Sequence, residues 1–279
     1  MNRLWVRIVV DRLVVGLIAI CVAIAAIPVA ILFLFVLIKG LPGMLAPGFF
    51  TESYHPVGVP GGGVANALVG TLIIVGFASV LAIPFGTLIG IFLSEYGRNR
   101  LGDSVRFISD VLTGMPSIAF GIFGYTVLVA TLGHFSAISG SVALAVLMLP
   151  VILRATETAL ILVPESLREA GLALGAPRWR VTLEVVVPAA LGGIVTGALL
   201  AMARAAGETA PLLFTALGND LFSTNPFRPM GALALTVFRN ALSPYPNLQD
   251  QAWAAALLLV IMVAITNILA RIYVRRVQR

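Results

Sequence analysis

The sequence predicts an all-α membrane protein with six transmembrane helices and with both termini in the cytoplasm. The chain is 59% hydrophobic and only 11% charged, whereas a soluble domain carries roughly 25% charged residues. Six apolar runs are long enough for the roughly 20 residues that a helix needs to cross a bilayer. The basic residues gather in short clusters between these runs, which is typical of the positive-inside pattern and not of a nucleic-acid-binding face.

The first span exceeds the 7–15 apolar residues of a signal peptide, and no A-x-A-like site follows it. Pro84 lies inside the second span and predicts a kink, while Gly114-Met115-Pro116 interrupts the third. A Gly/Pro-rich outer loop covers residues 39–63, and residues 207–250 form a long outer segment whose fold the sequence does not determine. The predicted spans cover about residues 13–38, 64–94, 107–132, 140–163, 181–206 and 252–273.

The distribution of basic residues supports this topology. The cytoplasmic segments hold Arg3, Arg7, Arg12, Arg98, Arg100, Arg106, Arg154, Arg168, Arg178, Arg180, Arg271, Arg275, Arg276 and Arg279, and the outer segments hold only Lys39, Arg228 and Arg239. Such an excess of basic residues marks the cytoplasmic side. The stretch from Pro164 to Pro188 therefore lies in the cytoplasm.

That stretch predicts a short helix over 164–176. Pro164 suits a first helical turn, and acidic side chains follow where they meet the positive end of the helix dipole. Gly175 is a plausible stop, and Pro177 forbids continuation. The apolar face consists of Leu167, Ala170 with Gly171, and Leu174.

The order Glu169-Ala170-Gly171, Gly175, then Val185 and Val187-Pro188 resembles the EAA loop of ABC importer permeases. Two valines stand where that family usually has Ile and Leu. The resemblance implies a coupling helix that docks on a cytoplasmic ATPase subunit, and an ordinary amphipathic surface loop is the alternative. The residues that would couple to the ATPase are Glu165, Arg168, Glu169, Ala170, Gly171, Leu174 and Gly175.

A second polar constellation lies at the outer half of the fifth span, where Arg204 precedes Glu208 by four residues. An Arg inside a membrane costs about 2.5–3.5 kcal/mol on insertion scales, so it should face a partner or a wet cavity. The two residues form either an internal ion pair or the polar lining of a path for an oxyanion, which Arg can bind bidentately.

Several segments in order, GGGVANALVG, IFLSEYGR, VRFISDVLTGMPSIAFG, SLREAGLALG and AGETAPLLFTAL, resemble the A-type membrane subunits of phosphate-specific (Pst) ABC importers. The resemblance implies a type I importer permease (MetI-like) fold in the cell inner membrane, with Arg204, Glu208 and Thr209 on the substrate path. It also implies a second, related permease subunit, two copies of an ATPase and an external phosphate-binding protein. Residues 61–279 would form the importer domain, and 1–60 an N-terminal addition with the first span.

The chain should break no bond itself. Lys39 is its only lysine and is followed by Gly40, so no Walker A motif is present. ATP and Mg would bind the partner ATPase, and we expect no cofactor on this chain. Cys21, His55 and His134 show no metal-ligand spacing, so no metal site is expected.

Two other functions fit parts of the sequence. A proton- or ion-coupled secondary anion transporter would use intramembrane carboxylates as proton relays. Asp110 could serve there, although it is expected to pair with Arg106, four residues before it. An intramembrane hydrolase would need Ser117 and His134 to meet.

Overall fold

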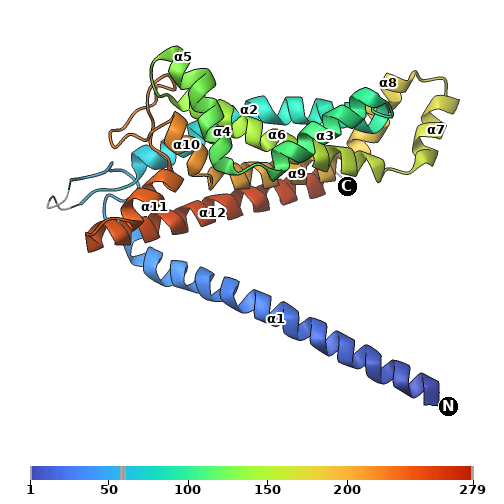
Figure 1. Cartoon of the computed structure of the whole chain (residues 1–279), viewed down its shortest axis with the longest axis horizontal. Coiled ribbons are helices and arrows are strands. Elements are labelled where there is room, and N and C mark those ends of the chain that lie inside the picture. Colours follow the sequence, from blue (N-terminus) through green and yellow to red (C-terminus); the bar gives the residue numbers. More distant parts are fainter. Residues whose placement is uncertain (1, 57–58, 60, 278–279) are drawn as a thin grey trace.

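The computed structural model describes residues 2–56, 59 and 61–277, and the regular secondary structure within them is helical apart from one isolated bridge between Leu217 and Met230 (Figure 1). Two π-helical turns, Tyr125–Val129 and Thr182–Val186, interrupt the α-helices. The α-helices are α1 Asn2–Met44, α2 Ala65–Glu95, α3 Arg100–Gly114, α4 Ser117–Gly124, α5 Ala130–Leu132, α6 Ala137–Ile161, α7 Glu165–Ala173, α8 Arg178–Val181, α9 Val187–Ala206, α10 Ala210–Thr215, α11 Leu233–Ala241 and α12 Pro246–Val277.

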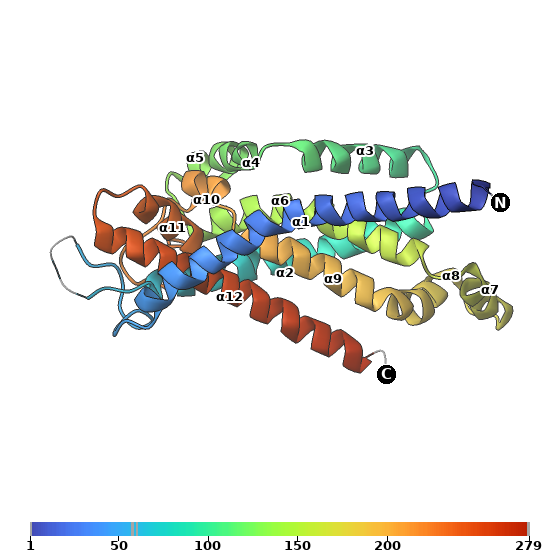
Figure 2. The same cartoon turned by 90° about the horizontal axis from the view of Figure 1, so that it is seen from below.

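Five of the described helical stretches are long and apolar enough to cross a membrane, and a bent pair, α3 with Ser117–Leu132, would make a sixth. The prediction of an all-α membrane protein is thus confirmed. Four of the predicted spans correspond to α2, α6, α8–α9 and α12 within a few residues. The spans run roughly along the long axis, with α7 and α8 at one end and α5, α10 and α11 at the other (Figures 1 and 2).

Helix α6 lies at the centre of the bundle, packed against α2 on one side and α9 on another. Its Leu144, Met148 and Ile152 are fully buried in the main apolar core. A side chain at Gly90 of α2 would place its Cβ 2.6 Å from the Cβ of Thr156 on α6, so only glycine permits this approach. Close helix contact through small residues is how membrane helices associate without a hydrophobic drive between them.

The third span is broken where the sequence predicted, at Gly114-Met115-Pro116, although its first helix begins at Arg100 and not near residue 107. Helix α3 begins at Arg100, where Asn99 caps it by accepting a hydrogen bond from the Gly102 N–H at 2.9 Å. It ends at Gly114, and the chain turns by 103° before Ser117. Pro116 causes the break, because the residue before a proline is driven out of the α region, and Met115 is extended.

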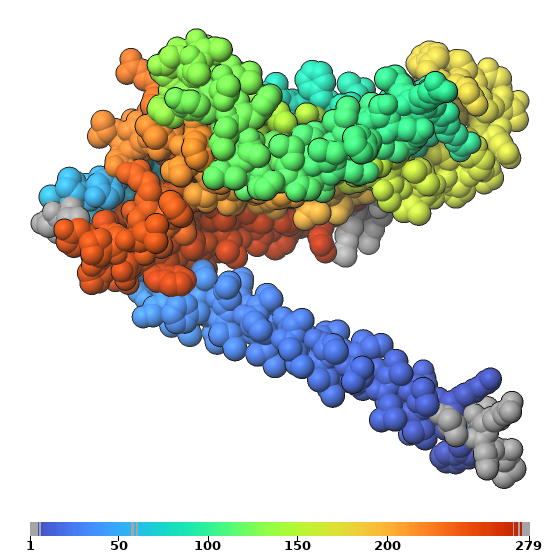
Figure 3. Space-filling model, in the orientation of Figure 1, coloured from blue at the N-terminus to red at the C-terminus, as the bar shows by residue number. Residues whose placement is uncertain are grey.

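Helix α1 extends beyond the predicted first span at both ends. Near its C-terminal end it packs on α12, where Phe35 meets Trp253 edge to face with ring centroids 5.1 Å apart. From there it diverges, and a wide gap separates its N-terminal half from the rest of the molecule (Figure 3). The apolar side chains of that half whose burial the structure describes are exposed, as expected for a lipid-facing helix.

The outer segment that the sequence left undetermined folds onto the start of α2. Asn66 donates a hydrogen bond to the carbonyl of Asn219 at 2.7 Å, and the Leu233 N–H donates to Oγ1 of Thr71 at 2.8 Å. The partners in these two hydrogen bonds are far apart in sequence, so no local sequence pattern could predict them. The same segment includes α10 and α11, which lie at the external end of the bundle (Figure 2).

Candidate functional site

The predicted cytoplasmic helix is α7, Glu165–Ala173, joined to α6 and α8 by short connections. Pro164 stands just before the helix and not within its first turn. Gly175 has a φ of +81°, which makes it the left-handed stop that the sequence predicted. All nine residues of α7 are described and none is buried, so the helix stands away from the bundle at its cytoplasmic end (Figure 1).

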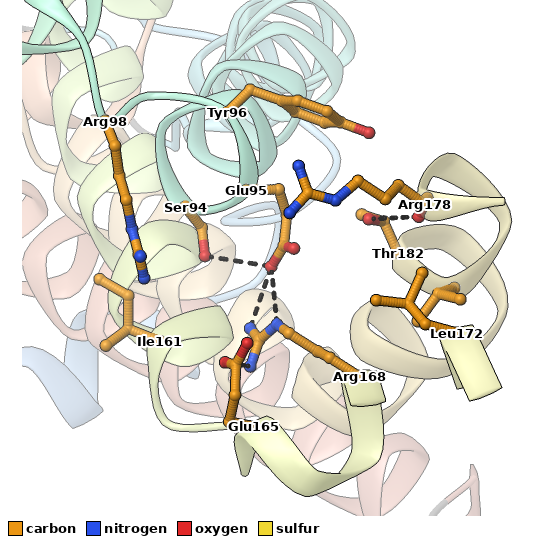
Figure 4. Close-up of a pocket in the computed structure, with 11 residues that line it drawn as sticks. Ser94, Glu95, Tyr96, Arg98, Ile161, Glu165, Arg168, Leu172, Arg178 and Thr182 are labelled. Atoms are coloured by element: carbon orange, nitrogen blue, oxygen red, sulfur yellow. Dashed lines mark hydrogen bonds and ion pairs between the residues drawn. The ribbon is translucent and has the colours of Figure 1, made fainter. Parts of the chain in front are cut away.

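Arg168 ties α7 to the ends of two spans (Figure 4). It donates to Oε1 of Glu95, the last residue of α2, at 3.0 Å from Nη2 and 3.3 Å from Nε. It also donates to the carbonyls of Val163 at 2.7 Å and Leu160 at 2.8 Å. The last carbonyls of a helix lack intrahelical partners, so Arg168 caps α6 while it holds α2 and α7 together. Sequence reasoning missed Glu95, which is 73 residues away from Arg168.

The other predicted coupling residues divide into two faces of α7. Gly171 lies toward the bundle, where an added Cβ would come within 3.0 Å of the Val181 methyl groups. Glu169, Ala170 and Leu174 lie exposed. Of the predicted apolar face, only Gly171 packs toward the bundle, whereas Leu167, Ala170 and Leu174 are exposed, Leu174 to 89%.

At the opposite end, Arg204 and Glu208 meet where α9 ends and α10 begins. Nε of Arg204 lies 3.4 Å from Oε1 of Glu208, and the side chains are 45% and 17% exposed. Helix α9 stops at Ala206 and Thr209 precedes α10, so the pair spans a helix break. No other hydrogen bond of the Arg204 head group is made to the described residues, which leaves its terminal nitrogens open to an anion.

A further charged cluster joins α3 to α6, and it corrects the pairing expected for Asp110. Arg154, not Arg106, binds Asp110. Arg106 binds the buried Glu157 at 2.7 Å and caps α2 through the carbonyl of Leu93 at 2.9 Å. Arg154 also reaches Glu157 at 3.1 Å. The sequence feature that could have pointed to this cluster is Glu157, which follows Arg154 by three residues near the end of an apolar run.

The alternative of an intramembrane hydrolase that uses Ser117 and His134 is wrong. Ser117 begins α4 and His134 follows α5, so they lie at opposite ends of one helical segment. Within the described part of the chain, no three His, Cys, Asp or Glu side chains are placed to hold a metal ion.

The comparisons with known proteins agree with this geometry. Residues 82–279 match the family described as binding-protein-dependent transport system inner membrane component. The chain is 48% identical over 235 residues to the phosphate transport system permease protein PstA of Yersinia pestis, covering 84% of this chain and 79% of the relative. It is 40% identical over 272 residues to the PstA of Haemophilus influenzae, covering 97% and 96%.

The chain belongs to this family of inner-membrane transport permeases. It is therefore a permease component of an ABC transporter, and the ATPase is a separate subunit. Family membership confirms the resemblance seen in the sequence and the inner-membrane location.

Two solved structures support the MetI-like fold. A chain of the inward-facing MetNI methionine ABC transporter matches with a TM-score of 0.64 at 22% identity, covering 77% of this chain and 96% of that one. A chain of a bacterial ABC transporter that imports alginate matches with a TM-score of 0.60 at 16% identity, covering 99% and 100%. At these identities the likeness concerns the fold alone.

Proposed function

We propose that this chain forms, with a second related permease subunit, the path along which inorganic phosphate crosses the inner membrane. Two copies of a cytoplasmic ATPase bind ATP and Mg and drive the cycle, and an external phosphate-binding protein delivers the anion. The observation that carries the proposal is the 40–48% identity to permeases named for phosphate transport over most of the chain. Residues 61–279 form the importer domain in this proposal, and residues 1–60 are an addition to it.

Uptake of labelled phosphate into proteoliposomes tests the proposal. The vesicles contain this chain, its permease partner and the ATPase, with the binding protein outside. We expect uptake that requires ATP inside and continues when an ionophore collapses the ion gradients. Uptake that stops with the gradient and ignores ATP would instead support the ion-coupled secondary transporter.

Coupling to the ATPase is assigned to α7. Its exposed face, with Glu169, Ala170 and Leu174, is free to contact another protein. Its opposite side is fixed through Arg168 to the ends of α2 and α6. A displacement of α7 is thus passed directly to two spans. A cysteine at Ala173 should crosslink to the ATPase in a nucleotide-sensitive way, and absence of such crosslinks would count against docking at this face.

The substrate path is assigned to Arg204, Glu208 and Thr209. A half-exposed guanidinium with open donors is suited to an oxyanion. Hydrogen phosphate carries a P–OH donor that sulfate lacks at neutral pH, and the carboxylate of Glu208 can accept that hydrogen bond. Glu208→Gln should therefore lower the preference for phosphate over sulfate in the uptake assay, and an unchanged preference would remove this role from Glu208.

A further inference from the structure

A pocket of about 390 Å³ lies between the cytoplasmic ends of α2 and α6 and the segment that carries α7 and α8 (Figure 4). This volume is in the range of small-molecule sites, roughly 300–1,000 Å³. Three arginines and two glutamates line it, and Arg168 is bonded to both Glu95 and Glu165. Three arginines against two glutamates leave the pocket with a net charge of +1.

Arg98 and Arg178 come from separate elements. Arg98 lies in the turn between α2 and α3, and Arg178 is the first residue of α8. Figure 4 shows their guanidinium groups on the two sides of Glu95, with Tyr96 above Arg178. Neither side chain forms an ion pair or hydrogen bond with the residues that the structure describes. Two guanidinium groups around one cavity suit a phosphate, whose oxygens can accept bidentate hydrogen bonds.

The last residue of α6, Ile161, contributes an exposed apolar side chain to the lining of the pocket. Ile161 lines the pocket and is 63% exposed, and the next residue, Leu162, is 78% exposed. Trp179, which adjoins Arg178, is also exposed. The pocket lies where two spans reach the cytoplasmic surface, the depth at which aromatic belts and lipid headgroups are found. Basic pockets between helices on this side of a membrane are suited to anionic lipid headgroups.

We propose that this pocket binds the phosphate headgroup of an anionic phospholipid from the inner leaflet. Arg98 and Arg178 contact the phosphate, and Ile161 contacts an acyl chain. A free phosphate ion would leave most of the volume and the exposed side chain of Ile161 unused. The headgroup would bridge the α2–α3 turn and α8, which directly follows α7 in the chain, and thereby restrain the coupling helix. This last consequence rests on the proposed function, whereas the binding itself does not.

Retention of lipid by the purified transporter complex tests the binding. The complex is washed in detergent, and bound phosphatidylglycerol and phosphatidylcholine are quantified by mass spectrometry. Each arginine near an anionic surface contributes about fivefold to binding, so Arg98→Gln with Arg178→Gln should lower retained phosphatidylglycerol on the order of 25-fold. The matched control is Arg100→Gln with Arg180→Gln, which removes two nearby charges outside the pocket. Equal retention by the two double variants would overturn the proposal.

Fluorescence of Trp179 separates a lipid from a soluble anion. In a Trp5→Phe, Trp253→Phe background, brominated phosphatidylglycerol should quench Trp179 more than brominated phosphatidylcholine does. The difference should vanish in the Arg98→Gln, Arg178→Gln variant and should persist when inorganic phosphate is added. Equal quenching by both lipids, or loss of the difference on adding inorganic phosphate, would reject the lipid. Neither measurement requires transport, so each is independent of the outcome of the uptake assay.

Discussion

Two arginine–glutamate pairs, one at each end of the molecule, have the same chemistry and different surroundings. At the cytoplasmic end, Arg168 and Glu95 are 14% and 13% exposed and are 73 residues apart in sequence. At the outer end, Arg204 and Glu208 are one turn apart, and Arg204 is 45% exposed. Arg168 also binds two backbone carbonyls, whereas Arg204 makes one long contact to Glu208.

The difference shows what decides the role of an arginine–glutamate pair in a membrane protein: whether the arginine keeps hydrogen-bond donors that the chain itself does not use. The head group of Arg168 is occupied by the chain itself, so its contribution is to stability and to the position of α7. The head group of Arg204 has donors to offer to an anion. An exposed ion pair is worth about 0–1 kcal/mol, while breaking a buried pair costs about 3–5 kcal/mol. The predictions below are ordered by the expected loss in free energy of unfolding.

The largest loss is expected for Arg168→Met. The substitution keeps an apolar stem but removes the charged donor from Glu95 and from the carbonyls of Val163 and Leu160. We expect about 3 kcal/mol of destabilisation, the low end for a buried pair because both side chains keep some contact with solvent. Thermal unfolding in detergent measures it. Glu165→Gln is the control, since Glu165 is 71% exposed and its pairing should be nearly neutral. An equal change in unfolding temperature for both variants would show that the Arg168–Glu95 pair does not stabilise the fold.

A smaller loss is expected for Glu95→Gln. The amide keeps the shape and one acceptor, and Arg168 keeps both of its carbonyl partners. We expect about 1–2 kcal/mol, the difference between a charged and a neutral hydrogen bond. The same unfolding assay measures it, and a loss as large as that of Arg168→Met would mean that the carbonyl contacts contribute nothing.

The smallest effect on stability, within about 0.5 kcal/mol, is expected for Arg204→Lys. Phosphate uptake should nevertheless fall on the order of tenfold, because Lys keeps the charge but loses the bidentate geometry. Arg228→Lys, at another exposed outer arginine, is the control and should transport normally. Wild-type uptake by Arg204→Lys would show that charge alone matters there or that Arg204 is structural.

The sequence predicts those features that depend on neighbours along the chain. Gly175 and Pro177 mark the end of α7, and Gly114-Met115-Pro116 marks the break in the third span. The size of that bend, 103°, is set by packing and could not be predicted. The pairing of Asp110 was wrong because Arg106, its favoured neighbour, binds Glu157 on another helix.

The candidate sites also separate into residues that neighbours along the chain reveal and residues that only the fold brings together. Arg204 and Glu208 could be found from their spacing of four residues, and the structure brings them together across a helix break. Glu95 could not be found, since nothing near it in sequence points to Arg168. The positions of α10 and α11 could not be predicted either, because they depend on contacts such as that of Asn66 with Asn219, 153 residues apart.

Helix α7 has no buried residue, and Arg168 bonds it to the ends of α2 and α6. A segment of this kind opens locally at little cost in free energy. In a cell, an unassembled copy of this chain would offer α7 to cytoplasmic proteases, and under the proposed docking a copy covered by the ATPase would not. The abundance of the permease should therefore follow the supply of its ATPase, so that subunit stoichiometry is enforced by degradation of the surplus.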